Sequence, residues 1–273
     1  LALPPYCLAD ATHSHGLGDR VYWPTIVSGR VIWHLGYTEA ASAAALTQSY
    51  QAFQRAASQQ DPSHRVRGIL TDGFDRTTSR MRALFPGARL GNWLRHAINK
   101  LPGTLAAIAS PMRKALRSQF HTLWSRARQR KGLRVFALGQ RLRHFADRVA
   151  HSAGVANGER VRRWFQDKKT GWYAVLEDPQ IPVTSTLLDQ AHHAFERKLF
   201  AMKGFHHPGG SQQAFLIGLA HLYNLVPYQR RAKHGSHCGM EVEGGTLPTR
   251  DWCLNLQILT SGGFQCAPGT LHH

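Results

Sequence analysis

Three carboxylates stand where they could bind divalent metal ions in a chain with few acids. The sequence has 34 Lys and Arg residues but only 16 Asp and Glu residues. Asp10 and Asp72 stand in or directly after short apolar runs, and Glu196 stands in a segment of helical pattern. Mg²⁺ prefers oxygen ligands, and two such ions about 4 Å apart can activate the attacking oxygen and stabilise the leaving oxygen of a phosphodiester. These acids are therefore candidate catalytic metal ligands.

Each of these acids also has a purely structural interpretation. An Asp-Gly pair after an apolar strand, as at Asp72, is typical of a turn. An acid such as Glu196 commonly sits on a helix surface and pairs with a cation one turn away. The hypothesis therefore rests on the three acids together rather than on any one of them. Other candidates for the same positions are Asp19, Asp75 and Asp189.

Positive charge is concentrated in the middle of the chain. The net charge is +18, and residues 111–170 contain 16 Lys or Arg against three acids, a local net charge of +13. A solvated helical face accounts for part of this excess, and the remainder favours a polyanionic partner, nucleic acid before an anionic membrane surface. We expect these cations to track DNA phosphates. The candidate contacts are Arg126, Arg128, Arg130, Lys131, Arg134, Arg141, Arg143, Arg162, Arg163, Lys168 and Lys169.

Histidines and tryptophans supply further candidates. His96 and His193 are candidate accessory residues, although the histidine pairs of the chain lack the spacing of a zinc motif. Trp164 and Trp172 are flanked by cations and are candidates to stack on exposed bases, with core packing as the alternative. No phosphate-binding Gly-rich loop is present, so we expect no nucleotide cofactor.

Composition disfavours several other classes of protein. The chain has 273 residues, 42% of them hydrophobic, which suits one large domain or two ordinary ones. No apolar run has transmembrane length, and no secretory signal opens the chain. The four cysteines show no CxxC spacing, so neither a disulfide framework nor a closed zinc site is expected. We expect a reducing, cytoplasmic setting without membrane association.

The carboxylates need rigid elements to position them. Alternating and apolar runs predict strands over 6–12, 20–27, 30–37 and 66–70. The first three are expected to be antiparallel neighbours, and the fourth to return beside the first through a crossover. The crossover is an Ala-rich helix over 40–57, for which Thr38 is a candidate N-cap.

After residue 76 the pattern becomes helical. Helices are predicted over 76–84, 89–100, 104–130, 133–151, 157–169, 184–200 and 212–225. The segment 172–176 is predicted to be extended. From residue 228 onwards Gly, His and isolated charges predict a poorly ordered tail, apart from 252–259.

The order of these elements resembles the RNase H-like fold of DDE-type insertion-sequence transposases and of the similar Mutator-like transposases. Asp10-Ala-Thr-His13 is similar to their Asp-Gly-Thr-His opening, and Gly29-Arg30-Val31 to the hairpin that follows it. Ile69–Gly73 resembles the strand of their second aspartate. His193–Arg197 resembles their Asn-Ala-Ile-Glu-Arg, and Met202–Phe205 the segment that trails it.

The resemblance implies DNA strand cleavage and joining with two Mg²⁺ (or Mn²⁺) ions held by Asp10, Asp72 and Glu196. It implies an α/β fold, an RNase H-like mixed sheet with a large all-helical insertion before the Glu-bearing helix. It also implies DNA partners (element ends and target), a homodimer in a synaptic complex, and a cytoplasmic, nucleoid-associated location. The implied domains are residues 1–76 (first part of the core), 77–170 (basic helical insertion), 171–227 (remainder of the core) and 228–273 (tail).

Two departures keep alternatives open. The Cys-x-x-His signature of some relatives is here Trp93-Leu-Arg-His96, and His193 replaces their usual Asn. No end-recognition module precedes Asp10, so binding through charge with little sequence discrimination is expected. The alternatives are a catalytically dead transposase fragment that only binds DNA, and a nuclease of RNase H fold.

Overall fold

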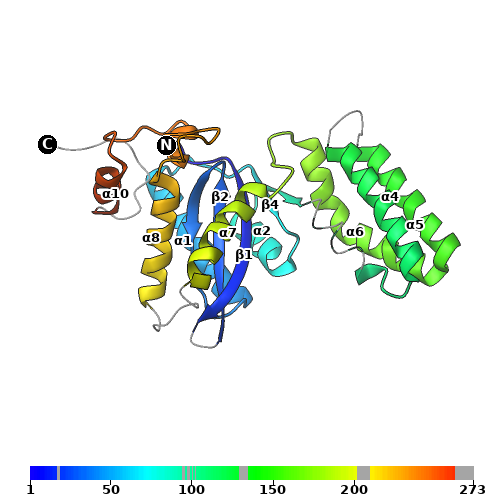
Figure 1. The fold of residues 1–273 in the computed structure, drawn as a ribbon. Helices are drawn as coiled ribbons and strands as arrows, with labels where there is room; N and C mark the ends of the chain where they lie inside the picture. Colours follow the sequence, from blue (N-terminus) through cyan, green and yellow to red (C-terminus); the bar gives the residue numbers. More distant parts are fainter. Residues whose placement is uncertain are drawn as a thin grey trace. The chain divides into compact units, whose positions relative to one another are not determined.

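A computed structural model describes residues 1–16, 19–93, 96, 99, 101, 103–128, 135–201 and 210–261. Within these ranges the fold is α/β (Figure 1). The strands are β1 (Tyr6–Gly16), β2 (Asp19–Ser28), β3 (Val31–Leu35), β4 (Gly68–Thr71) and β5 (Arg89–Asn92). The helices are α1 (Ala43–Gln60), α2 (Asp75–Leu84), α4 (Ser110–Arg128), α5 (Val135–Ala153), α6 (Val155–Glu177), α7 (Thr186–Ala201), α8 (Gly210–Leu225), α9 (Gly239–Val242) and α10 (Trp252–Ser261).

The sheet is mixed, and its strand order is β3-β2-β1-β4-β5. The predicted antiparallel pairing of the first three strands is confirmed, and β4 pairs with β5 in parallel. The chain divides into two compact units. The first unit comprises Leu1–Arg67, Asp75–Ala88 and the chain from Thr186 onwards, and the second comprises Gly68–Phe74 and Arg89–Ser185.

Helix α1 of the first unit forms as predicted but begins later. Its N-cap is Ser42, whose hydroxyl accepts a hydrogen bond from the Ala45 amide at 3.2 Å. Thr38, the expected cap, instead exchanges backbone hydrogen bonds with Tyr22 of β2 and so extends the sheet. The side chains that α1 buries recur at helical spacing, which anchors one stripe of the helix in the core. They are Leu46, Tyr50, Phe53 and Ala57.

Helix α8 covers the edge strand β3 with two amide side chains. Asn224 accepts from the Ile32 amide and donates to the Ile32 carbonyl, both at 2.8 Å. Gln213 likewise accepts from the Tyr37 amide at 2.8 Å and donates to a carbonyl of β3 at 3.1 Å. An uncovered edge strand offers free backbone groups to other chains. These amides therefore satisfy part of the β3 edge from within the same unit.

In its described part, the segment after α8 differs from the predicted poorly ordered tail, whose residues 262–273 lie outside the described part of the chain. Residues 226–261 form turns together with α9 and α10. Glu243 accepts from the Arg30 amide at 3.0 Å, and Asp251 caps α10 by accepting from the Cys253 amide at 2.8 Å. The isolated charges that suggested disorder therefore hold backbone groups instead.

The second unit packs three helices around an aromatic core. Helices α4, α5 and α6 lie side by side, drawn in green in Figure 1. Phe120, Phe145 and Phe165 come one from each helix, with ring centroids 5.3–6.0 Å apart. Such aromatic clusters bury large apolar areas and fix the helices relative to one another.

Three predicted boundaries in this unit are wrong. Residues 89–92 form β5 rather than a helix, because parallel pairing with β4 buries Gly91 and Asn92. Helix α4 begins at Ser110 instead of residue 104. The segment 172–176 is helical, because Trp172 and Val175 continue the buried stripe of α6 beyond Phe165. Within the described ranges, no helix combines the length and apolarity needed to cross a bilayer.

The aromatic core of the second unit generates a stability prediction. Phe145→Ala should lower the free energy of unfolding by about 3–5 kcal/mol, because it leaves a cavity where the ring is fully buried. The matched control is Phe136→Ala on the same helix, where the ring is 70% exposed and the expected change is within about 0.5 kcal/mol. Urea denaturation followed by circular dichroism measures both, and equal losses would contradict the assigned packing.

Candidate active site

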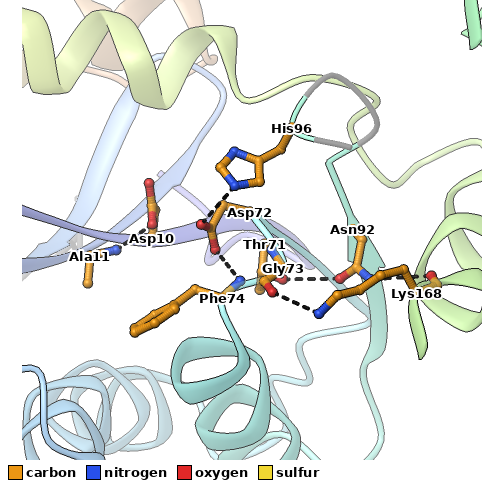
Figure 2. Close-up of polar contacts among 9 residues, drawn as sticks. All are labelled: Asp10, Ala11, Thr71, Asp72, Gly73, Phe74, Asn92, His96 and Lys168. Carbon is orange, nitrogen blue, oxygen red and sulfur yellow. Dashed lines mark hydrogen bonds and ion pairs between the residues drawn. The ribbon is translucent and has the colours of Figure 1, made fainter. Parts of the chain in front are cut away.

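Asp72 is held directly after β4, a strand whose four residues are all buried. One carboxylate oxygen, Oδ1, accepts from the Phe74 amide at 2.6 Å (Figure 2). The other, Oδ2, lies 3.8 Å from Nε2 of His96. The Asp72 side chain is 19% exposed, so the carboxylate is held in one direction and is still accessible to solvent.

His96 is positioned by its neighbour in sequence as well as by Asp72. Its imidazole stacks on the indole of Trp93 with ring centroids 5.9 Å apart and planes 28° apart. The stacked ring points a nitrogen at Asp72 (Figure 2). When protonated, this imidazole forms an ion pair with the carboxylate. This is the histidine that the sequence identified as a candidate accessory residue.

A hydrogen-bonded chain joins the end of β4 to α6. The ammonium group of Lys168 donates to the Gly73 carbonyl at 3.2 Å, and Asn92 donates to the Lys168 carbonyl at 3.4 Å (Figure 2). The Thr71 hydroxyl donates to Oδ1 of Asn92 at 3.5 Å. A Cβ at Gly171 would lie 2.4 Å from Cγ of Asn92, so α6 approaches this amide as closely as only glycine permits. These hydrogen bonds hold the Lys168 ammonium group at the carbonyl of Gly73, the residue that follows Asp72.

Asp10 belongs to the first unit, in the middle of β1. Its Oδ1 accepts from the following amide, that of Ala11, at 2.7 Å. Its backbone carbonyl accepts from the hydroxyl of Tyr50 on α1 at 2.9 Å. Its partner across the strands is Thr25 of β2. Cross-strand partners point to the same face of a sheet, so Asp10 and Thr25 share a face.

Helix α7 packs on β1 and β2 at this face. Nε2 of buried His192 lies 3.1 Å from the Thr25 hydroxyl oxygen. That hydroxyl donates to the Trp23 carbonyl at 2.9 Å, so its oxygen can accept a hydrogen bond from the Nε2–H group of a neutral His192. Burial lowers the pKa of His192 to about 4, which keeps the imidazole neutral near pH 7. The sequence did not indicate His192 as a site residue beyond its place in a histidine pair; its position one helical turn before Glu196 was the available signal.

Glu196 follows His192 by four residues and is therefore on the same side of α7. Its side chain is 44% exposed, and Oε2 lies 3.1 Å from Nδ1 of His193. His193, predicted as an accessory residue, is itself largely exposed. Asp10 and Glu196 thus lie on elements of the first unit that pack together, and the Glu196 carboxylate contacts the His193 imidazole.

No preformed group of three ligands accompanies these carboxylates. Among the described residues, no three His, Cys, Asp or Glu side chains gather as a metal ion would require. The alternatives Asp19 and Asp75 are exposed, and Asp189 lies in the first turn of α7. Each candidate carboxylate offers oxygen atoms that suit a hard cation.

The predicted phosphate contacts are distributed over α4, α5 and α6. Arg126, Arg141, Arg143 and Arg163 are exposed, and Arg162, Lys168 and Lys169 are partly buried. Arg162 makes ion pairs with Asp147 and Glu159. The side chain of Arg128 and the residues Arg130, Lys131 and Arg134 lie outside the described part of the chain.

The two tryptophans serve the core rather than the surface. Trp172 is 1% exposed, so its predicted role in base stacking is wrong. Trp164 is partly buried and packs edge-on against Trp172 with centroids 5.6 Å apart. Their flanking cations suggested exposure, but the tryptophans point inward while the cations remain on the outside of α6.

Comparison with known proteins adds no family assignment. The sequence matches no protein-family model, and no curated protein matches it significantly.

The buried histidines predict an acid-sensitive fold. Burial lowers the pKa of both His34 and His192 to about 4. Between about pH 4 and about pH 6.5 the unfolded chain binds protons that the folded chain does not. The free energy of unfolding is therefore unaffected by these histidines above about pH 6.5 and falls as the pH decreases towards 4. His192→Gln should remove up to about 3 kcal/mol of this decrease, measured by urea unfolding between pH 7 and pH 4.

The control for this measurement is His144→Gln, which replaces an exposed histidine of α5. It should change the free energy of unfolding at pH 7 by no more than about 0.5 kcal/mol, as for other exposed side chains. Parallel profiles for the native chain and His192→Gln would contradict the neutral, hydrogen-bonded state assigned to His192.

Proposed function

We propose that this chain is the catalytic domain of a DDE-type DNA transposase with an RNase H-like fold. The observation that carries the proposal is the group of side chains at the end of β4. The carboxylate of Asp72 directly follows the strand, and it accepts from the Phe74 amide. Nε2 of His96 lies 3.8 Å from this carboxylate, and the Lys168 ammonium group donates to the carbonyl of Gly73, the next residue. A metal ligand, a group that orients it and a phosphate-attracting cation are the parts that phosphodiester chemistry requires.

Two further features support the proposal. In the first unit, Asp10 and Glu196 lie on elements that pack together, on the side of the sheet marked by the His192–Thr25 contact. In the second unit, helices α4–α6 expose cations that match a DNA backbone. We propose DNA element ends and target DNA as substrates, and two copies of the chain acting together, since joining requires two ends.

Asp10, Asp72 and Glu196 would hold Mg²⁺ or Mn²⁺ in this scheme. The bound ions would supply an activated attacking oxygen and a stabilised leaving oxygen. The residues of the chain would do the positioning. Phe74 and His96 fix the Asp72 carboxylate, and Lys168 attracts a phosphate towards the end of β4.

One observation favours a second candidate function, DNA binding without cleavage. The described residues contain no group of three metal-ligating side chains. If the carboxylates never share an ion, the cations of α4–α6 would still bind DNA. A metal-dependent nicking assay separates the two functions, and a test for strand joining separates a transposase from a nuclease of RNase H fold.

Asp72→Asn should reduce Mg²⁺-dependent nicking of supercoiled plasmid by at least about 100-fold, because losing a ligand exceeds the 10–100-fold cost of losing a residue that supports one. DNA affinity should survive, since the cations remain. The matched control, Asp167→Asn, removes an exposed acid of α6 in the same unit and should nick normally. Unchanged nicking in Asp72→Asn would reject Asp72 as a ligand.

DNA binding should depend steeply on salt. If about five of the exposed cations contact phosphates, the logarithm of the binding constant should fall with the logarithm of the salt concentration with a slope near −4 to −5. Fluorescence anisotropy with a duplex of random sequence measures this slope between 50 and 200 mM salt. A slope near zero would show that the charge of the second unit does not track a nucleic-acid backbone.

A further inference from the structure

A groove of about 850 Å³ runs between α5 and α6 of the second unit. Its lining residues are single residues or adjacent pairs that recur about once per helical turn, from Val135 to Asp147 on one helix and from Arg162 to Tyr173 on the other. They therefore form one stripe of each helix, about 18 Å long. All of these residues belong to a single unit, so the groove is a property of the helical unit itself.

The floor of the groove is apolar and aromatic. Leu142 and Phe165 are buried beneath it, and Tyr173 and Phe136 flank it. Gly139 makes this shape possible, because a Cβ there would lie 2.7 Å from the Tyr173 hydroxyl oxygen. The glycine lets the tyrosine cross towards α5 at this level.

Phe136, which flanks this floor, differs from the other phenylalanines of the helices in its exposure. Its ring is 70% exposed, whereas Phe120, Phe145 and Phe165 are at most 5% exposed. Helices α4–α6 thus bury three phenylalanines and leave a fourth, Phe136, exposed beside a groove. Because the ring lies beside a concave surface lined by apolar and cationic side chains, it is a candidate contact for another molecule.

The rim of the groove is cationic. Arg143 and Lys169 line it and make no ion pair with any other described residue. Arg162 lines it too and is paired with Asp147, the only acid among the described residues that line the groove. An occupant that met this rim would gain most from carrying negative charge.

We propose that this groove binds unpaired nucleotides of single-stranded DNA. Open aromatic faces with flanking cations are the features that bind single strands, since bases stack on the rings while the cations hold the phosphates. The bases of a duplex are stacked on one another and cannot lie on Phe136. The inference rests on the proposed function for its choice of DNA, and it adds a site for strands that cleavage or melting leaves unpaired.

The Phe136 ring tests the stacking component directly. The full chain is titrated, in EDTA to exclude chemistry, into a fluorescein-labelled oligothymidylate of about 12 nucleotides. Phe136→Ala should weaken binding at least about fivefold, while binding to a matched duplex changes less than about twofold. Phe136→Leu should lose as much as Phe136→Ala, because it keeps apolar bulk without a flat face, and Phe136→Trp should retain binding.

Val155→Ala is the matched control, since Val155 lies in the same unit and is 71% exposed. It should leave single-strand affinity unchanged. For the rim, Lys169→Gln should weaken single-strand binding more than Lys114→Gln, which removes an exposed cation of α4 away from the groove. Equal effects of Phe136→Ala and Val155→Ala, or full retention of affinity in Phe136→Leu, would overturn the stacking site.

The outcome is distinguishable from failure of the proposed function. If the native chain does not nick DNA but Phe136→Ala weakens single-strand binding, the groove proposal stands and the proposed catalysis is rejected. A chain that nicks DNA but binds single strands equally well without the ring rejects the groove alone. Equal weakening of single-strand and duplex binding by Phe136→Ala would also overturn it, because stacking requires unpaired bases.

Discussion

The side chain of Asn92 ties the sheet of the second unit to its helices, and the candidate site depends on this tie. Its oxygen accepts from Thr71 at the end of β4, and its nitrogen donates to the Lys168 carbonyl on α6. The Lys168 ammonium in turn donates to Gly73, beside Asp72. A buried amide must satisfy both ends of its dipole, and doing so here fixes where β4 ends and where α6 presents a cation.

The second unit separates its apolar and cationic residues to serve two purposes. Its aromatic residues meet inside, where Phe120, Phe145 and Trp172 hold three helices together. Its cations are exposed or partly buried, which gives the helices α4–α6 a strongly positive surface. Phe136 breaks this division, and it does so where the cations line a groove. Helices α4–α6 thus combine an exposed aromatic ring with exposed cations, which is the combination on which the proposed single-strand site rests.

The sequence predicted those parts of the fold that local pattern controls. The alternation of β1 to β3 and the periodicity of α1 and α8 were sufficient to predict these elements. Strand β5 was missed because four residues carry too little pattern, and because the burial of Asn92 depends on partners distant in sequence. Thr38 and Ser42 are both plausible caps, and only pairing of Thr38 with Tyr22 decides between them. The candidate carboxylates could be found from residue type and spacing. The contacts of Asp72 with His96 and of His192 with Thr25 join residues distant in sequence, so they depend on the tertiary structure.

Iron-mediated backbone cleavage tests the central claim, that Asp10, Asp72 and Glu196 share a metal site, most directly. Fe²⁺ replaces Mg²⁺ in the DNA-bound chain, and ascorbate with peroxide then generates radicals that cut the protein backbone close to the ion. The account predicts three clusters of cuts, around residues 10, 72 and 196, all suppressed by excess Mg²⁺. Cuts at one of these segments alone, or cuts that excess Mg²⁺ does not suppress, would contradict it.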